Sequence, residues 1–158
     1  MGISHPTPSA EAVTAGETPA AGFDYGQAFS RNIGWVTQAE QQRLRNKCVA
    51  IAGGGGVGGV HLLTLARLGV AKFHIADFDT FDIVNFNRQV GANINTIGQP
   101  KVEVLARMAR EINPEIEIRI FPDGLNQANL PAFLHGADLY VDGLDFFAFD
   151  IRQSTFAL

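Results

Sequence analysis

The sequence predicts an α/β fold in which a mostly parallel β-sheet carries helices on both faces. Three observations lead to this prediction. Short apolar runs alternate with helical segments along the chain, and such an alternation forms right-handed crossovers in a parallel sheet. A glycine-rich turn directly follows the first apolar run. Apolar residues make up 46% of the chain and charged residues 18%, which is typical of a compact domain with its own core.

Composition separates a tail from one folded domain. Residues 1–22 are rich in Pro, Ala, Ser, Thr and Gly and show no hydrophobic periodicity, which predicts a flexible tail. From residue 23 onward the composition shifts to that of a folded protein. We therefore expect a single folded domain over residues 23–158.

The first half of this domain contains two expected helices and two expected strands. Thr37 and Glu40 form the pattern of a capping box, which starts a helix. An uninterrupted short apolar run is typical of a strand that is buried on both faces. Gly69 stands where a helix is expected to end. The expected elements are a helix from Thr37 to about Asn46, a strand over Cys48–Ala52, a helix over Val60–Leu68 and a strand over Lys72–Asp77.

The second half repeats the alternation. Pro100 suits the first position of a helix, and apolar residues follow it at helical spacing. Asn113-Pro114 ends that helix, and the alternating residues after it predict a strand. The expected elements are a helix from Pro100 to about Ile112, a strand over Glu115–Ile120, a helix over roughly Gln127–Leu134, a strand over Asp138–Asp142 and a last helix that begins near Phe146.

The glycine-rich turn after the first strand predicts a nucleotide site. Gly53, Gly55 and Gly58 occupy the glycine positions of the pattern G-x-G-x-x-G. The first permits a tight turn, the second lets backbone amides approach a phosphate, and the third allows the next helix to pack on the strand. The N-terminus of that helix offers unpaired N–H groups to an anion. Asp77 ends the second strand, where its carboxylate can bind a ribose hydroxyl. Together these features predict a Rossmann-like fold.

Polar side chains beyond Asp77 favour ATP over a dinucleotide. Arg88 and Lys101 supply two cations, and Asn85 and Gln89 supply two amides. A guanidinium matches phosphate oxygens with two hydrogen bonds, and a lysine adds a movable charge. A triphosphate that is about to be cleaved needs this additional charge compensation, whereas a diphosphate needs only the helix N-terminus. The expected nucleotide-binding residues are Gly53, Gly55, Gly56, Gly58, Asp77, Asp79, Asn85, Arg88, Gln89 and Lys101.

Charge and cysteine content argue against several other classes. The net charge is −4 at pH 7 and no basic cluster is present, so a protein that binds duplex nucleic acid is not expected. No apolar run is long enough to cross a membrane. Cys48 is the only cysteine, which excludes an internal disulfide and fits a cytoplasmic protein. Its position in an apolar strand favours a buried thiol over the alternative of a nucleophile, and His61 and His74 are expected to be structural.

Seven short motifs follow one another from the glycine turn to the last residues: GGGGVGG, LGV, DFD, NxNRQ, IGQPK, INP and DLYVDGLD. Their order and spacing resemble the ThiF/MoeB group of the ubiquitin-activating-enzyme (E1-like) superfamily, from about Phe29 onward. Enzymes of this group use ATP and Mg²⁺ to adenylate a carboxylate, often the C-terminal Gly-Gly of a ubiquitin-like sulfur carrier. The resemblance therefore implies an ATP-dependent adenylyltransferase that releases pyrophosphate. A sulfur-carrier protein, a peptide and a modified tRNA carboxylate all stay open as substrates.

The resemblance also implies roles for individual residues. Asp77 would hold the ribose, and Asn85, Arg88, Gln89 and Lys101 would contact the triphosphate. Asp145 corresponds to the acid that holds Mg²⁺, although its place after a strand also suits a helix N-cap. Arg31 matches an N-terminal arginine that reaches the ATP of the other subunit, which implies a homodimer. The expected catalytic residues are Arg88, Lys101, Asp145 and Arg31.

Two departures from the family pattern are visible. Leu144-Asp145-Phe146 stands where family members usually have Thr-Asp-Asn. The family domain also normally continues well beyond the length of this chain. Residues 23–158 are therefore expected to be the N-terminal part of an adenylyltransferase domain whose C-terminal half is absent, and the chain alone is a doubtful catalyst.

Two other functions explain part of the pattern. An oxidoreductase domain that binds NAD or FAD explains the glycine turn and Asp77. It leaves without a role Asn85, Arg88, Gln89 and Lys101. A non-catalytic E1-like scaffold subunit fits the short chain, but it does not explain why Arg88 and Lys101 are present. Solvated surface charges are the remaining interpretation of these two residues.

Overall fold

Four parallel strands form one sheet in the order β3-β2-β1-β4. The computed structural model describes residues 22–144. The predicted tail, apart from Gly22, and the helix expected near Phe146 lie outside the described residues. The strands are β1 (Cys48–Ala52), β2 (Lys72–Ala76), β3 (Glu117–Phe121) and β4 (Leu139–Asp142). The prediction of a parallel α/β sheet is confirmed.

β1 lies inside the sheet, between β2 and β4. All five of its residues are buried, which is why this run contains no strongly polar side chain. Its last residue, Ala52, lies opposite Ala76 of β2 and Asp142 of β4. Because the strands are parallel and in register, the segments that follow these three residues leave the sheet at the same edge.

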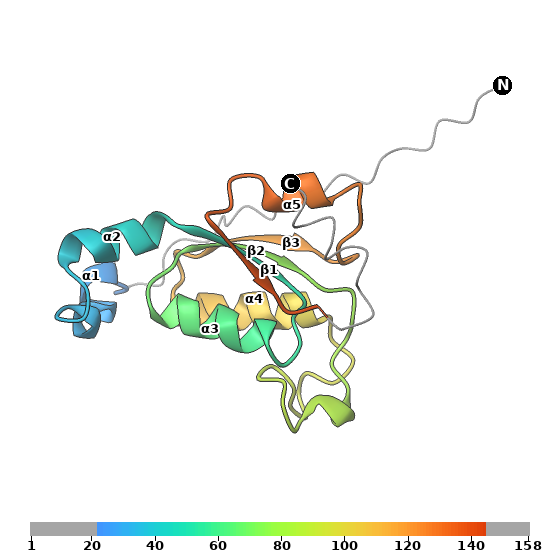
Figure 1. Ribbon diagram of the computed structural model, residues 1–158. Helices are drawn as coiled ribbons and strands as arrows, with labels where there is room; N and C mark the ends of the chain where they lie inside the picture. Colours follow the sequence, from blue (N-terminus) through green and yellow to red (C-terminus); the bar gives the residue numbers. More distant parts are fainter. Residues whose placement is uncertain (1–21, 145–158) are drawn as a thin grey trace.

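Helices cover both faces of the sheet (Figure 1). α3 (Gly58–Arg67) and α4 (Lys101–Ile112) lie on one face, and the short α5 (Leu130–Leu134) lies on the other. Each face has its own core. The larger includes Val49, Leu62, Phe73, Val102 and Leu105, and the smaller includes Ala50, Ala52, Phe121, Leu130 and Phe133. Within residues 22–144, no helix is long and apolar enough to cross a membrane.

The N-terminal helices are tied to the end of α3. They are α1 (Tyr25–Ala28), η1 (Ser30–Asn32) and α2 (Gln38–Asn46). The predicted capping box is confirmed, because Thr37 Oγ1 accepts from the Glu40 N–H and Glu40 Oε2 accepts from the Thr37 N–H. The Tyr25 hydroxyl donates to the Gly69 carbonyl at 2.6 Å. Gly69 itself has a φ of +92°, as expected for a glycine that ends a helix.

β3 and α5 begin two or more residues later than predicted, because asparagine side chains bind the backbone before them. β3 begins at Glu117 rather than Glu115, and α5 begins at Leu130 rather than near Gln127. Asn113 Oδ1 accepts the Glu115 N–H at 3.0 Å, and Asn126 Oδ1 accepts the Asn129 N–H at 3.0 Å. Such local bonds favour a turn over a strand or a helix.

Candidate nucleotide-binding site

The candidate site lies at the carboxyl ends of β1 and β2, where the glycine turn joins β1 to α3. Gly53 leaves β1 with a φ of +86°, and its N–H donates to the Ala76 carbonyl at 2.8 Å. A positive φ of this size favours glycine over any residue with a side chain. In open α/β sheets, ligands bind outside the carboxyl ends of the strands. The turn therefore has the position that a nucleotide site requires.

Two glycines of the turn are required by packing. A Cβ atom at Gly58 would lie 1.8 Å from the Gly53 carbonyl oxygen, and one at Gly53 would lie 2.4 Å from the Gly143 carbonyl oxygen. Both distances are too short for any side chain. This close packing also explains why α3 begins at Gly58 and not at Val60, where the sequence predicted it.

Gly55 and Gly56 differ from these two glycines, because the space beside them is open. A Cβ at Gly55 would meet only Gln89 Nε2, at 3.7 Å, and one at Gly56 would meet Arg88 atoms at 3.5 Å and beyond. The protein backbone therefore does not require glycine at Gly55. A ligand that approaches the backbone closely would require it.

Backbone amides of the turn are available to an anion. The first hydrogen bond along α3 in the described residues runs from the Gly59 N–H to the Gly55 carbonyl, at 3.2 Å. The N-cap residue, Val57, provides no side-chain hydrogen bond. The N–H groups of residues 55–58 therefore have no acceptor within the described part of the chain. Four such amides at a helix N-terminus form an anion-binding site.

Asp77 joins the glycine turn to the segment after β2. Its Oδ2 accepts the Gly54 N–H at 2.6 Å, and its Oδ1 accepts the Asp79 N–H at 2.8 Å. These bonds explain why β2 ends at Ala76, one residue before the predicted end. Each carboxylate oxygen has a further lone pair, so the carboxylate retains the capacity to accept a ribose hydroxyl.

Arg88 and Gln89 lie over the glycine turn, next to Gly56 and Gly55. The Arg88 side chain is exposed, and its Nη1 donates to the Val84 carbonyl at 3.0 Å and to Asn87 Oδ1 at 3.1 Å. Gln89 is only 7% exposed, and its Oε1 has no hydrogen-bond partner within residues 22–144. A buried polar atom without a partner is costly. The Gln89 carboxamide is thus a group that the fold leaves unsatisfied beside the turn.

Asn85 has a structural role that the sequence did not reveal. Its side chain is buried, and its Oδ1 accepts the Asp82 N–H at 2.9 Å as part of a capping box on η2 (Ile83–Asn85). This bond fixes the turn that precedes Arg88 and Gln89. A contact between Asn85 and the nucleotide stays a prediction.

Lys101 points toward the same end of the sheet. Pro100 precedes α4 as its N-cap residue, and not as its first residue as predicted, so Lys101 begins the helix. Its side chain is 6% exposed and its Nζ donates to Asp79 Oδ2 at 2.9 Å. Leu105, one turn further on, packs beside Gly54 and Gly59 of the glycine turn. Residues four apart share one face of a helix, so Lys101 and Leu105 both face the turn side of α4.

Arg31 does not lie at the glycine turn of its own chain. Arg31 is exposed in η1, which follows α1 at the opposite side of the molecule from the start of α3 (Figure 1). A contact from Arg31 to a nucleotide of the same chain is therefore not formed. Asp145 lies outside the described residues. Among the residues that are described, no group of three or more His, Cys, Asp or Glu side chains has the arrangement of a metal site.

Sequence reasoning missed Gly54 and Gly143. The Gly54 N–H holds the Asp77 carboxylate, and the Gly143 N–H donates to the Ala52 carbonyl at 2.8 Å. A Cβ at Gly143 would lie 2.9 Å from the Ala52 carbonyl oxygen and 3.0 Å from the Gly53 carbonyl oxygen. A glycine directly after the fourth apolar run was the available signal.

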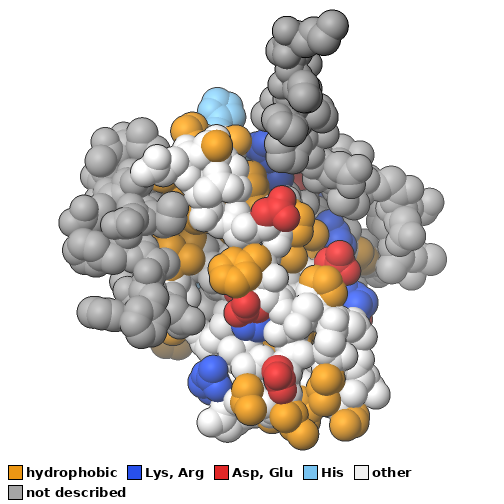
Figure 2. Space-filling model, turned by 90° about the vertical axis from the view of Figure 1, so that its right-hand side faces the viewer, with side chains coloured by type: hydrophobic (Ala, Val, Ile, Leu, Met, Phe, Trp, Pro, Cys, Tyr) orange, Lys and Arg blue, Asp and Glu red, His pale blue; other side chains and the backbone are white. Residues whose placement is uncertain are grey.

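The connection from β2 to α4 carries Arg88 and Gln89 and exposes apolar side chains. Ile83, Val84 and Ile94 are 62%, 68% and 75% exposed. Figure 2 shows hydrophobic side chains gathered at the lower end of this face, over that connection. The candidate site therefore borders an apolar surface.

The contacts of Cys48, His61 and His74 agree with the structural roles that the sequence predicted. Cys48 is buried in β1, and burial raises the pKa of its thiol, which disfavours the thiolate needed by a nucleophile. Burial lowers the pKa of His74, whose Nδ1 lies 2.6 Å from the Phe133 carbonyl oxygen. His61 Nδ1 contacts the carbonyl of Val57, one helical turn earlier.

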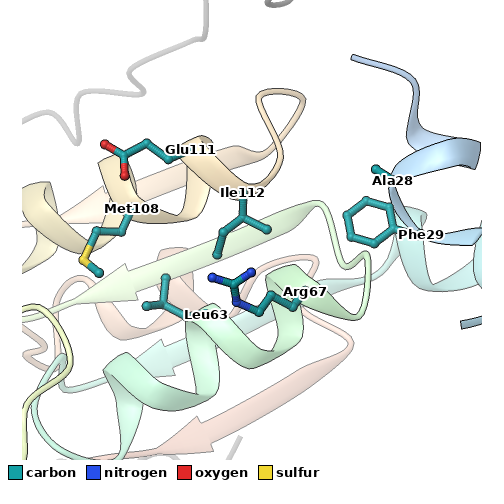
Figure 3. A pocket seen from close by; sticks show the side chains of 7 residues that line it. All are labelled: Ala28, Phe29, Leu63, Arg67, Met108, Glu111 and Ile112. Atoms are coloured by element: carbon teal, nitrogen blue, oxygen red, sulfur yellow. The ribbon is translucent and has the colours of Figure 1, made fainter. Parts of the chain in front are cut away.

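A pocket of about 500 Å³ lies at the far end of α3 and α4 from the glycine turn. Figure 3 shows Leu63 and Arg67 of α3 opposite Ile112 of α4, with Phe29 beyond them. Arg67 ends α3, about 14 Å along the helix from Gly58. The pocket contains none of the predicted site residues, and the glycine turn remains the candidate site.

Comparison with known proteins decides the family. The family model described as "ThiF family" matches residues 29–156. The chain belongs to the ThiF family. The resemblance of the seven motifs is therefore confirmed, and so is the Rossmann-like nucleotide-binding fold that it implied.

Proteins with similar sequences include two enzymes from bacteria. The tRNA threonylcarbamoyladenosine dehydratase of Bacillus subtilis (strain 168) is 36% identical over 125 residues, which are 78% of this chain and 49% of that protein. The probable adenylyltransferase/sulfurtransferase MoeZ of Mycobacterium tuberculosis (strain ATCC 25618 / H37Rv) is 37% identical over 108 residues, or 68% of this chain and 28% of that protein.

A solved relative holds ATP. The crystal structure of Escherichia coli tRNA N6-threonylcarbamoyladenosine dehydratase, TcdA, in complex with ATP has a TM-score of 0.73 and 26% sequence identity to this chain. The similarity covers 82% of this chain and 56% of that one. This chain therefore spans about half the length of the E. coli and B. subtilis dehydratases.

Proposed function

We propose that this chain carries the nucleotide site of an ATP-dependent adenylyltransferase that converts a carboxylate into an acyl-adenylate. One observation carries the proposal: backbone amides at the N-terminus of α3 that are unpaired among the described residues lie beside the side chains of Arg88 and Gln89. The amides and the arginine provide positive potential, as a triphosphate requires, and Gln89 adds a carboxamide that can form hydrogen bonds with the nucleotide. The ATP complex of TcdA and the adenylyltransferase name of MoeZ support the same assignment.

Each predicted site residue has a place in this proposal. Asp77 binds the ribose, and Asn85 and Gln89 contact the nucleotide with their amides. Arg88 and Lys101 compensate the charge of the triphosphate. The phosphates lie on the turn itself, along Gly53, Gly55, Gly56 and Gly58. Asp79 lines the same site.

In the proposed reaction, a carboxylate oxygen of the substrate attacks the α-phosphorus of ATP in line. A new bond forms between that oxygen and the α-phosphorus. The bond between the α-phosphorus and the α,β-bridging oxygen breaks, and pyrophosphate leaves with that oxygen. Negative charge builds up on the leaving pyrophosphate, where Arg88 and Lys101 provide electrostatic stabilisation. The protein contributes position and charge, and no side chain forms a covalent intermediate.

Asp145 is the one residue that we propose as a ligand of Mg²⁺. The donors in residues 22–144 do not by themselves make a magnesium site, so no step above depends on the ion. A carboxylate at Asp145 and the phosphate oxygens of ATP are the hard oxygen ligands that Mg²⁺ prefers. When bound, the ion would supply further charge neutralisation to the triphosphate.

The assembly and the substrate are also proposals. A homodimer would bring Arg31 of one subunit to the ATP of the other, and the exposed position of Arg31 allows such a contact. The carboxylate belongs to a ubiquitin-like sulfur carrier or to a peptide, since a relative from Thermus thermophilus is named sulfur carrier protein adenylyltransferase and E. coli MccB is solved with MccA. The single, buried, unpaired cysteine supports a cytoplasmic location.

The first test compares the binding of ATP with the binding of NAD. Isothermal titration calorimetry of the whole chain is expected to detect ATP with Mg²⁺ and no binding of NAD. Binding of NAD alone would instead support the oxidoreductase alternative, and binding of neither would support the scaffold. Carboxylate-dependent exchange of pyrophosphate into ATP then tests adenylation, with a peptide that ends in Gly-Gly as the substrate.

A further inference from the structure

Asp79 is an acid that the fold holds at three points. Its N–H donates to Asp77 Oδ1 at 2.8 Å, its carbonyl accepts the Lys101 N–H at 2.9 Å, and its Oδ2 accepts from Lys101 Nζ at 2.9 Å. The next residue, Thr80, pairs with Pro100 in an isolated antiparallel bridge. Asp79 is therefore fixed between the end of β2 and the start of α4, unlike a solvated surface acid.

The two members of this ion pair differ in burial. The Lys101 side chain is 6% exposed, whereas the Asp79 side chain is 49% exposed. Asp79 is the only acid that pairs with Lys101 within residues 22–144. A buried ammonium without a counter-charge is costly, and a long lysine side chain relieves that cost by turning its head group toward water. The location of the Lys101 ammonium therefore depends on Asp79.

A continuous set of hydrogen bonds links this ion pair to the glycine turn. The Gly54 N–H bonds to the Asp77 carboxylate, that carboxylate bonds to the Asp79 N–H, and the Asp79 carboxylate bonds to Lys101 Nζ. Leu105 packs beside Gly54 from the same face of α4. The ammonium is thus held in a defined relation to the amides on which phosphates are proposed to lie.

We propose that Asp79 is the positioning residue for Lys101. This inference rests on the proposed function and deepens it. Asp79 holds the ammonium at the border of the site before the nucleotide binds, and the phosphates of ATP then share the ammonium with it. Asp79 contacts neither the ribose nor the base and acts on the nucleotide only through Lys101.

A double-mutant cycle tests this role, with calorimetry of the whole chain and ATP or adenosine as the ligand. Asp79→Asn keeps the shape and removes the charge, and it is expected to weaken ATP binding about tenfold and to leave adenosine binding unchanged, because charged hydrogen bonds contribute about 1.5–3 kcal/mol. Lys101→Met is expected to weaken ATP binding at least as much. The double variant is expected to bind ATP no more weakly than Lys101→Met, because the two residues act as one unit.

Control variants and stated outcomes make the test decisive. Glu103→Gln removes an exposed acid from the same first turn of α4 and is expected to change nothing. Asp79→Glu restores the carboxylate and is expected to recover most of the lost affinity, and Asp79→Ala replaces Asp79→Asn in the cycle if that variant does not fold. Additive losses in the cycle, or an equal loss for adenosine, would overturn the inference. Wild-type chain that binds NAD and not ATP would overturn the proposed function itself.

Discussion

At the amino ends of the strands, the charged side chains of Asp138 and Arg45 are bonded to the fold, whereas at the carboxyl ends several polar groups have no partner among the described residues. Asp138 uses both carboxylate oxygens at the amino edge, one for Lys47 Nζ and one for the Cys48 N–H. Arg45 pairs with Glu115 at 2.6 Å nearby. At the carboxyl edge, the amides of residues 55–58 and Gln89 Oε1 are unsatisfied within the described chain.

This contrast separates stability from binding. A polar group that is already bonded contributes to the fold and has little left for a ligand, whereas an unsatisfied group costs stability until a ligand binds it. The two edges should therefore respond differently to substitution. Changes at the carboxyl edge should alter nucleotide affinity, and changes at the amino edge should alter the free energy of unfolding.

The largest expected effect comes from Gly58→Ala. Its Cβ would lie 1.8 Å from a backbone oxygen, so the variant should lose about 3 kcal/mol or more of unfolding free energy, or fail to fold. Gly55→Ala is the matched control, because its Cβ meets nothing closer than 3.7 Å. Urea denaturation should show this control within about 1 kcal/mol of wild type, with ATP binding weakened about tenfold. Equal stability of the two variants would contradict the packing role of Gly58.

Arg88→Ala should affect binding and not stability. The guanidinium is exposed and donates only to neighbours in its own segment, so its loss should change the unfolding free energy by less than about 0.5 kcal/mol. ATP binding should weaken about tenfold, because one charged hydrogen-bond partner of the phosphates is removed. Calorimetry and urea denaturation of the same preparation check both values. A variant with lower unfolding free energy and unchanged ATP affinity would contradict the assignment of Arg88 to binding.

Arg45→Ala should show the opposite pattern at the amino edge. Arg45 pairs with Glu115 and lies over the Tyr25 ring, with its guanidinium carbon 4.6 Å from the ring centroid. A partly exposed ion pair and one cation–π contact together suggest a loss of about 1 kcal/mol. ATP affinity should stay within a factor of about two. Urea denaturation and calorimetry measure the two quantities, and a tenfold change in affinity would show that the edges are coupled.

The smallest effect concerns the pH dependence of stability at Asp138. The hydrogen bond from Lys47 holds the pKa of this carboxyl below its ordinary value of 3.8. The stabilisation is therefore present above that value and is lost as the pH falls below it. Asp138→Asn should be less stable than wild type at pH 7, and the difference should shrink at pH 3. Thermal unfolding at both pH values measures this, and a difference that grows in acid would contradict the assignment.

The fold could be predicted where its signals are local. β1 and the capping box of α2 follow from a short apolar run and from two residues three positions apart. The starts of β3 and α5 could not be predicted, because the side chains of Asn113 and Asn126 bind backbone N–H groups in a way that depends on the actual turn. The pairing of β1 with β4 could not be predicted either. The two strands lie about ninety residues apart in the sequence, and no local pattern encodes which strands pair over that distance.

The site shows the same division. The glycine turn and Asp77 are predicted because their chemistry depends on a short spacing along the chain. The ion pair of Asp79 with Lys101 depends on the side-chain rotamers of both residues and on the bridge between Thr80 and Pro100. No sequence pattern predicts this ion pair. The direct nucleotide contacts remain predictions.

The distance in sequence between β1 and β4 has a consequence for the order of folding. Gly53 packs against Gly143, and the Cys48 N–H bonds to Asp138, 90 residues later. Because a chain is synthesised from its N-terminus, the glycine turn emerges from the ribosome long before the strand that packs beside it. A nascent chain that ends before residue 138 has the glycine turn without β4 beside it. The turn therefore gains its contact with Gly143 only after about 90 further residues have been made.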